Sequence, residues 1–216
     1  MDPFHERLAR TGLSAAGRYG FALAGGYAVQ AAGLLERPSE DVDLFTAWNR
    51  RDEFGAAVAA VVEAYRDDGF TVNVDRRYDT FARLAVTDGS QASKVELGVD
   101  WRANEPILMA VGPVLHPDDA VANKMGALYG RALARDFIDI DATLQSGRYT
   151  REAVLGLVER ADSGFDRRMF ADALGQADVL DPDDFAQYGL TGEALDDLRK
   201  RFASWRRELR GESPPG

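Results

Sequence analysis

The sequence predicts an α+β fold, in which an N-terminal α/β part with a mostly antiparallel or mixed sheet precedes a C-terminal helical part. Two observations support this prediction. Helix-like and strand-like apolar patterns alternate in the first part of the chain, whereas from residue 118 onward the patterns are helical only. The change of character falls at residues 113–117, which contain two prolines. We therefore predict domains at residues 1–115 and 116–216.

Each predicted element follows from its local pattern. A short apolar run at 21–24 comes before Gly25-Gly26 and an Ala-rich stretch to about Leu35, which indicates strand, tight turn and helix. Two alternating runs on either side of the turn at 88–90 indicate a hairpin. The other predicted strands are 42–45 and 70–74, the hairpin strands are 80–87 and 93–101, and the other predicted helices are 5–18, 51–67, 118–132, 134–145, 151–162, 166–175 and 191–209.

The composition excludes several kinds of site. The 216-residue chain has no cysteine and only two histidines, His5 and His116, so a disulfide scaffold, a cysteine zinc site, an iron–sulfur cluster and a thiol nucleophile are excluded. No run of about 18 apolar residues predicts a membrane span, and the first ten residues do not resemble a secretion signal. We expect a soluble, cytoplasmic protein.

The charge is acidic overall but uneven along the chain. With 26 Lys and Arg against 36 Asp and Glu, the formal charge is −10, which argues mildly against non-specific binding of nucleic acid. The segment 199–210 is nevertheless basic. It is interpreted either as a solvated amphipathic helix face or as a patch that contacts a phosphate backbone, for instance of RNA.

The most informative pattern is Asp41-Val42-Asp43, at the start of the predicted strand 42–45. Residues i and i+2 of a strand point to the same face, so the two carboxylates lie together and repel each other unless cations sit between them. Oxygen ligands without histidine or cysteine suit Mg²⁺. The pattern therefore predicts a magnesium site that could hold a nucleoside triphosphate.

Two further features extend this prediction. The turn at Gly25-Gly26 would present backbone N–H groups at a helix N-terminus, where a phosphate could bind; the alternative is a plain tight turn. A third carboxylate is expected on a neighbouring strand, because alternation places Glu96 and Asp100 on one face of the strand 93–101. Glu96, in mid-strand, is preferred; Asp100 stays open.

Three motifs resemble those of one known family. They are Gly25-Gly26 followed by Arg37-x-Ser39-x-Asp41-x-Asp43-Leu44, then Asp119-x₄-Lys124, then Arg131-x₃-Arg135-Asp136-x₂-Asp139. The first is similar to the first motif of the DNA polymerase β-like nucleotidyltransferases, and the other two are similar to motifs of its AbiEii/AbiGii-type toxin branch. The resemblance runs from residue 23 to residue 139. It departs from the wider superfamily at Gly26, where many relatives carry a serine.

The resemblance implies Mg²⁺-dependent transfer of a nucleotide from an NTP to an acceptor hydroxyl. In this interpretation Asp41, Asp43 and Glu96 hold the metal and Glu96 also orients or deprotonates the hydroxyl. Ser39 bonds a phosphate or a neighbouring carboxylate. The nucleotide is contacted by Gly25, Gly26, Arg37, Lys124, Arg131 and Arg135. Asp136 and Asp139 either fix these cations or contact the nucleotide. The resemblance further implies a bacterial toxin with a cognate antitoxin, acting on the tRNA 3′ end.

The two C-terminal motifs also have a simple helical interpretation. On one continuous helix with 100° per residue, Lys124, Arg131 and Asp139 fall within about 80° of each other. Arg135 lies between them and Asp136 beside them. Gly126 and Gly130 are possible breaks in this helix. The alternative is a surface salt-bridge ladder.

Three other functions fit part of the pattern. A small-molecule nucleotidyltransferase, such as one that modifies aminoglycosides, shares the first motif, and an acidic protein suits a cationic acceptor. A non-catalytic binding protein could retain the fold. A kinase-like transfer of the γ-phosphate could use the same scaffold.

Overall fold

The structure, a computed structural model, describes residues 1–212. The chain divides into two compact units, Met1–Ala120 and Val121–Gly216. The division falls inside helix α4 (Pro117–Arg131), after residue 120, whereas the sequence placed the boundary after residue 115. No helix in the described part of the chain is long and apolar enough to cross a membrane.

The first unit is built on a seven-stranded mixed sheet with the order β3-β4-β5-β2-β1-β7-β6. The pairs β2–β5 and β1–β7 are parallel, and the other neighbours are antiparallel, which confirms the predicted mixed sheet. The strands are β1 (Ala22–Leu23), β2 (Asp41–Ala47), β3 (Thr71–Arg77), β4 (Phe81–Thr87), β5 (Ala92–Asp100), β6 (Ile107–Met109) and β7 (Gly112–Val114). The short β6–β7 hairpin was not predicted.

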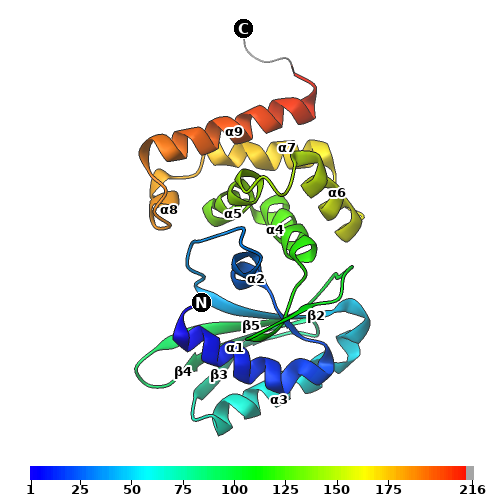
Figure 1. The fold of residues 1–216 in the computed structure, drawn as a ribbon, viewed down its shortest axis with the longest axis vertical. Coiled ribbons are helices and arrows are strands. Elements are labelled where there is room, and N and C mark those ends of the chain that lie inside the picture. Colours follow the sequence, from blue (N-terminus) through cyan, green and yellow to red (C-terminus); the bar gives the residue numbers. More distant parts are fainter. Residues whose placement is uncertain (213–216) are drawn as a thin grey trace. The chain divides into compact units, whose positions relative to one another are not determined.

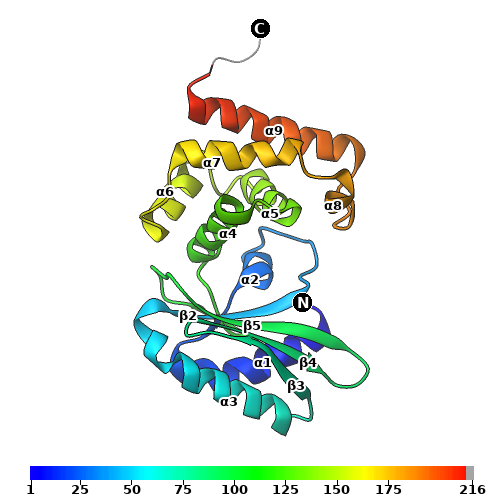
Figure 2. The same ribbon diagram turned by 180° about the vertical axis from the view of Figure 1, so that it is seen from behind.

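Helices cover both faces of this sheet. Helices α1 (Pro3–Ala16) and α3 (Phe54–Asp67) lie side by side on one face, and α2 (Gly25–Ala31) lies on the other (Figure 1). The view from behind shows the same three layers (Figure 2). The side chain of Asp2 caps α1 by accepting bonds from the backbone N–H groups of Phe4 and His5. Two 3₁₀ turns, Gly17–Tyr19 and Trp48–Glu53, complete the unit.

The core lies between the sheet and the layer of α1 and α3. Strand β2 alternates strictly, with Val42, Leu44 and Thr46 buried and the residues between them partly exposed. Tyr65 of α3 is fully buried, and its hydroxyl donates a hydrogen bond of 2.9 Å to the carbonyl of Leu8. Burial raises the pKa of this phenol. Because one face of β2 is committed to the core, its other face is left for polar side chains.

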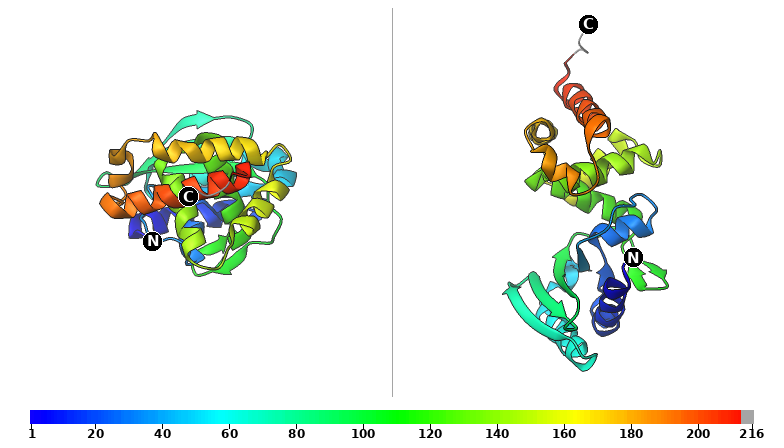
Figure 3. Two further views of the ribbon diagram at one scale, coloured as in Figure 1. Left: turned by 90° about the horizontal axis from the view of Figure 1, so that it is seen from above. Right: turned by 90° about the vertical axis from the view of Figure 1, so that its left-hand side faces the viewer.

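The second unit contains helices only, among its described residues. They are the rest of α4, α5 (Ala134–Gln145), α6 (Arg151–Ala161), α7 (Arg167–Leu174), a 3₁₀ turn (Gly175–Asp178), α8 (Pro182–Ala186) and α9 (Gly192–Arg210). Helices α7 and α9 lie side by side (Figure 3). They share an aromatic core in which Phe170, Phe202 and Trp205 are buried. The rings of Phe170 and Trp205 meet edge to face with centroids 5.2 Å apart.

Close packing at Gly12 of α1 gives a first prediction. A Cβ at this position would lie 2.6 Å from both Leu44 Cδ1 and Tyr65 Oη. Gly12→Ala is therefore expected to lower the free energy of unfolding by about 1–3 kcal/mol. A matched control is Gly126→Ala in α4, where a Cβ meets no atom within 4 Å; this change is expected to stabilise by up to about 1 kcal/mol. Urea unfolding followed by circular dichroism measures both, and equal stabilisation would contradict the packing described.

Candidate active site

Three carboxylates meet on the polar face of the sheet. Asp41 and Asp43 project from β2, and Glu96 projects from the parallel strand β5, whose register places Asp43 beside Glu96. One carboxylate oxygen from each residue lies within 4.8 Å of the others. All three residues are partly exposed. The structure thus brings together the three residues that the sequence predicted as metal ligands.

This donor set fits a magnesium ion. It offers only carboxylate oxygens, from residues that solvent can reach, and hard divalent cations prefer such ligands. Three carboxylates this close repel one another, and a bound cation would relieve that repulsion. The arrangement can therefore hold one or more hard divalent cations on the face of the sheet that carries α2.

Asp100, the alternative third carboxylate, lies elsewhere. It pairs in register with Ala47, at the far end of β2. Its Oδ1 accepts a 2.7 Å hydrogen bond from the backbone N–H of Trp101. Burial raises the pKa of the Asp100 carboxyl. The register therefore favours Glu96 as the third member of the cluster.

The Gly25-Gly26 turn is shaped around two of the predicted site residues. Gly25 begins α2 with φ of 58°, and a Cβ there would lie 1.7 Å from Oδ2 of Asp43. A Cβ at Gly26 would lie 2.6 Å from Oγ of Ser39. The two glycines let the backbone approach Asp43 and Ser39 more closely than any side chain would permit. Phosphate binding at this turn stays a prediction.

One site residue was missed by the sequence reasoning. Arg83 on β4 pairs in register with Glu96. Its Nη2 lies 2.6 Å from Glu96 Oε1, and its Nε donates to the same oxygen at 2.8 Å. The signal was available, because counting back from the turn at 88–91 through the antiparallel hairpin places residue 83 opposite residue 96.

The Arg-Asp motif forms a corner between two helices. Helix α4 ends at Arg131, and Ala132 adopts a left-handed conformation with φ of 47° before α5 begins. Asp136 is fully buried and accepts hydrogen bonds from the Arg131 guanidinium, at 2.8 and 2.9 Å, and from the backbone N–H of Leu133, at 3.1 Å. The predicted alignment on one continuous helix is therefore wrong, and the break lies at Ala132 rather than at Gly126 or Gly130.

The lysine of the second motif is held by an aspartate of the third. Lys124 Nζ lies 2.7 Å from Oδ2 of Asp139, whose side chain is fully buried, and only 11% of the Lys124 side chain is exposed. This ion pair joins α4 to α5 despite the break between them. Two roles were left open for Asp136 and Asp139, namely to fix the neighbouring cations or to contact the nucleotide. Their observed contacts are of the first kind. Arg135 is partly exposed on α5.

The remaining motif residues lie in the first unit. Asp119 is buried and accepts bonds from the backbone N–H groups of Ala103 and Asn104, at 3.2 and 3.0 Å, so it anchors the loop that follows β5. Arg37 donates to the carbonyl of Pro38 at 3.0 Å, within the loop that leads to Ser39.

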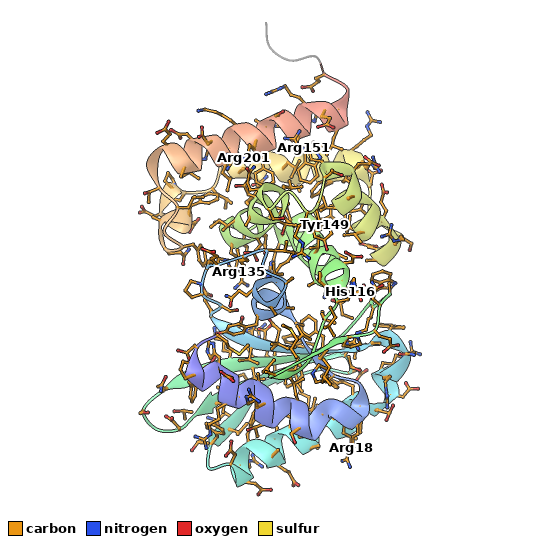
Figure 4. The ribbon with its side chains drawn as sticks, in the orientation of Figure 1. Arg18, His116, Arg135, Tyr149, Arg151 and Arg201 are labelled. Carbon is orange, nitrogen blue, oxygen red and sulfur yellow. The ribbon has the colours of Figure 1, made fainter. Side chains whose placement is uncertain are left out.

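The basic segment of α9 makes many contacts within its own unit. Arg201 forms two 2.7 Å bonds to Asp141, and Arg199 donates to the carbonyls of Ala177 and Leu180 at 2.9 Å. Arg151 donates to the carbonyl of Arg201 at 3.0 Å, and the two side chains lie near each other beneath α9 (Figure 4). These contacts favour the interpretation as a structural and solvated helix face over a patch dedicated to RNA.

Comparison with known proteins identifies the family. The profile of the family described as "Nucleotidyl transferase AbiEii toxin, Type IV TA system" matches residues 8–215. The chain belongs to this family. It is therefore a nucleotidyltransferase, and the resemblance drawn from its three motifs is confirmed.

Solved structures share the fold of this AbiEii-family chain. MenT4, a nucleotidyltransferase toxin from Mycobacterium tuberculosis, is 18% identical with a TM-score of 0.55, and the match covers 96% of this chain and 90% of that one. JHP933 from Helicobacter pylori is 19% identical with a TM-score of 0.51, over 96% and 93% of the two chains. A search among curated proteins found no match.

The contact between Gly25 and Asp43 gives a second prediction. Gly25→Ala should reduce nucleotidyl transfer by about 100-fold, because its Cβ would displace the Asp43 carboxylate by roughly an ångström or more. Gly33→Ala is the matched control, since Gly33 also has a positive φ, of 69°, but its Cβ would meet nothing within 4 Å. The measurement is the steady-state rate of nucleotidyl transfer by the two folded variants. Equal rates would show that the Gly25–Asp43 approach has no role in the reaction.

The Lys124–Asp139 pair gives a third prediction, on stability. Asp139→Ala leaves a nearly buried ammonium without this partner, and is expected to lower the free energy of unfolding by about 3–5 kcal/mol. The double variant Lys124→Met with Asp139→Ala should recover much of that loss, because it also removes the nearly buried ammonium. Chemical denaturation measures both. If the double variant is no more stable than Asp139→Ala alone, the ion pair does not account for the stability.

Proposed function

We propose that this AbiEii-family enzyme transfers a nucleoside monophosphate from an NTP to an acceptor hydroxyl in a Mg²⁺-dependent reaction. The observation that supports this best is the clustering of Asp41, Asp43 and Glu96 on neighbouring parallel strands. In the reaction a bond forms between the acceptor oxygen and the α-phosphorus. The bond from that phosphorus to the bridging oxygen breaks, and pyrophosphate leaves. Such transfers depend mainly on positioning and on neutralisation of charge.

The residues of the first unit would have different roles in this reaction. Asp41 and Asp43 would hold the metal, with Glu96 as the third ligand. Bound Mg²⁺ would neutralise the triphosphate and lower the pKa of the attacking hydroxyl. Glu96 would also orient that hydroxyl or accept its proton. The backbone at Gly25 and Gly26, with the Ser39 hydroxyl beside it, would contact phosphate oxygens.

Other roles in the proposal are carried over from the family motifs. Lys124 and Arg37 would bind the triphosphate, and Arg131 and Arg135 would contact the nucleotide. Asp136 and Asp139 would act through these cations, in keeping with the observed pairs Arg131–Asp136 and Lys124–Asp139. An ion pair of this kind fixes the position of the lysine before the substrate binds.

We propose the 3′ end of tRNA as the acceptor, on the basis of family membership. Modification of that end would block translation, which suits a toxin that is paired with an antitoxin and acts in the cytoplasm. The net charge of −10 suits a cationic small molecule better than RNA, so the assay must include one.

The decisive assay incubates the protein with each NTP labelled at the α-phosphate, Mg²⁺ and bulk tRNA, with an aminoglycoside in a parallel reaction. We expect label on tRNA, release of pyrophosphate, and loss of activity when EDTA removes the metal. Asp43→Asn should lower the rate by more than about 100-fold. Asp52→Asn is the control, because its side chain is 94% exposed on the same unit.

Three outcomes would overturn parts of this proposal. Release of nucleoside diphosphate would indicate transfer of the γ-phosphate instead. Label on the aminoglycoside alone would show that the acceptor is a small molecule rather than tRNA. Full activity of Asp43→Asn would remove the carboxylate cluster from the mechanism.

A further inference from the structure

Arg83 stands in a row of charges that crosses the sheet. The register aligns Asp43 of β2 with Glu96 of β5, and Glu96 with Arg83 of β4. Side chains that are paired in register point to the same face of a sheet. The candidate metal cluster is therefore bordered, on the side of β4, by a cation that touches one of its members.

The contact is one-sided on the carboxylate. Both Arg83 bonds, at 2.6 and 2.8 Å, end on Oε1 of Glu96. Among the described residues, Oε2 has no hydrogen-bond partner, so it is available to a cation. The guanidinium also lies 5.9 Å from the ring of Phe81, and only 29% of the Arg83 side chain is exposed. Arg83 thus holds Glu96 by one oxygen and is itself held by packing.

Two physical effects of Arg83 oppose each other at this place. Its charged hydrogen bonds restrict the carboxylate to one orientation and reduce the repulsion among the three acids. The same positive charge repels a divalent cation held by those acids. Arg83 should therefore improve the geometry of Glu96 while it weakens the affinity for the metal.

We propose that Arg83 is a positioning residue of the transfer reaction, which orients Glu96 toward the metal and the attacking hydroxyl. This inference rests on the proposed function. It distinguishes Arg83 from a residue that merely supports the strand. Loss of such a structural residue would disorder the cluster and lower metal affinity and turnover together. Loss of Arg83 should lower turnover and raise metal affinity.

The test compares Arg83→Met with Arg83→Lys and with a control, Arg76→Met. Arg76 pairs in register with Arg83 one strand farther from the cluster, is exposed, and makes no ion pair with Glu96. Binding of Mn²⁺ to the protein without NTP is measured by electron paramagnetic resonance. The turnover number is measured separately with saturating Mg²⁺ and NTP, and thermal melting checks that each variant is folded.

For Arg83→Met we expect the turnover number to fall by about 10–100-fold and Mn²⁺ to bind about threefold to tenfold more tightly. Arg83→Lys keeps the charge, so its Mn²⁺ affinity should stay near that of the wild type. Its turnover number should lie between those of the wild type and Arg83→Met. Arg76→Met should match the wild type in Mn²⁺ affinity and in turnover number.

Unchanged turnover in Arg83→Met, or weaker or unchanged Mn²⁺ binding, would overturn the inference while leaving the proposed function intact. If Arg83→Met fails to fold, Arg83→Lys decides, and wild-type turnover in that variant would overturn the inference. Failure of the proposed function looks different: the wild-type protein itself would then transfer no nucleotide.

Discussion

The parallel pairing of β2 with β5 is the interaction on which the candidate site depends. It sets Asp43 beside Glu96, and it commits the alternate residues of both strands to the core. A slip of one residue would turn Glu96 toward α1 and α3 and replace it with a buried valine or leucine. The apolar face of the sheet thus determines where the acids lie, because misplacing them would expose the core.

Glycine and aspartate play complementary structural roles around this pairing. The carboxylate of Asp43 occupies space that any side chain at position 25 would fill. In the helical unit, Asp136 and Asp139 are fully buried and bind Arg131 and Lys124. A residue of a family motif can therefore serve a backbone approach or a buried ion pair as well as direct contact with substrate.

Much of this arrangement follows from sequence patterns, and the exceptions have physical causes. Alternation predicts the strands around Asp41, Asp43 and Glu96, since one face of each is apolar. It cannot choose between Glu96 and Asp100, because that choice depends on register with a distant strand. The strands β6 and β7 have three residues each, too few to show a period. The predicted helices 118–132 and 134–145 already separate at this point, but the left-handed conformation of Ala132 has no sequence signal, because alanine favours helix.

The central claim is that these three carboxylates bind a divalent cation, and anomalous diffraction from crystals soaked in Mn²⁺ tests it most directly. The account predicts an anomalous peak within about 2–2.5 Å of oxygen atoms from Asp41, Asp43 and Glu96. A protein that transfers nucleotides yet shows its Mn²⁺ peak elsewhere, or shows none at saturating Mn²⁺, would contradict it.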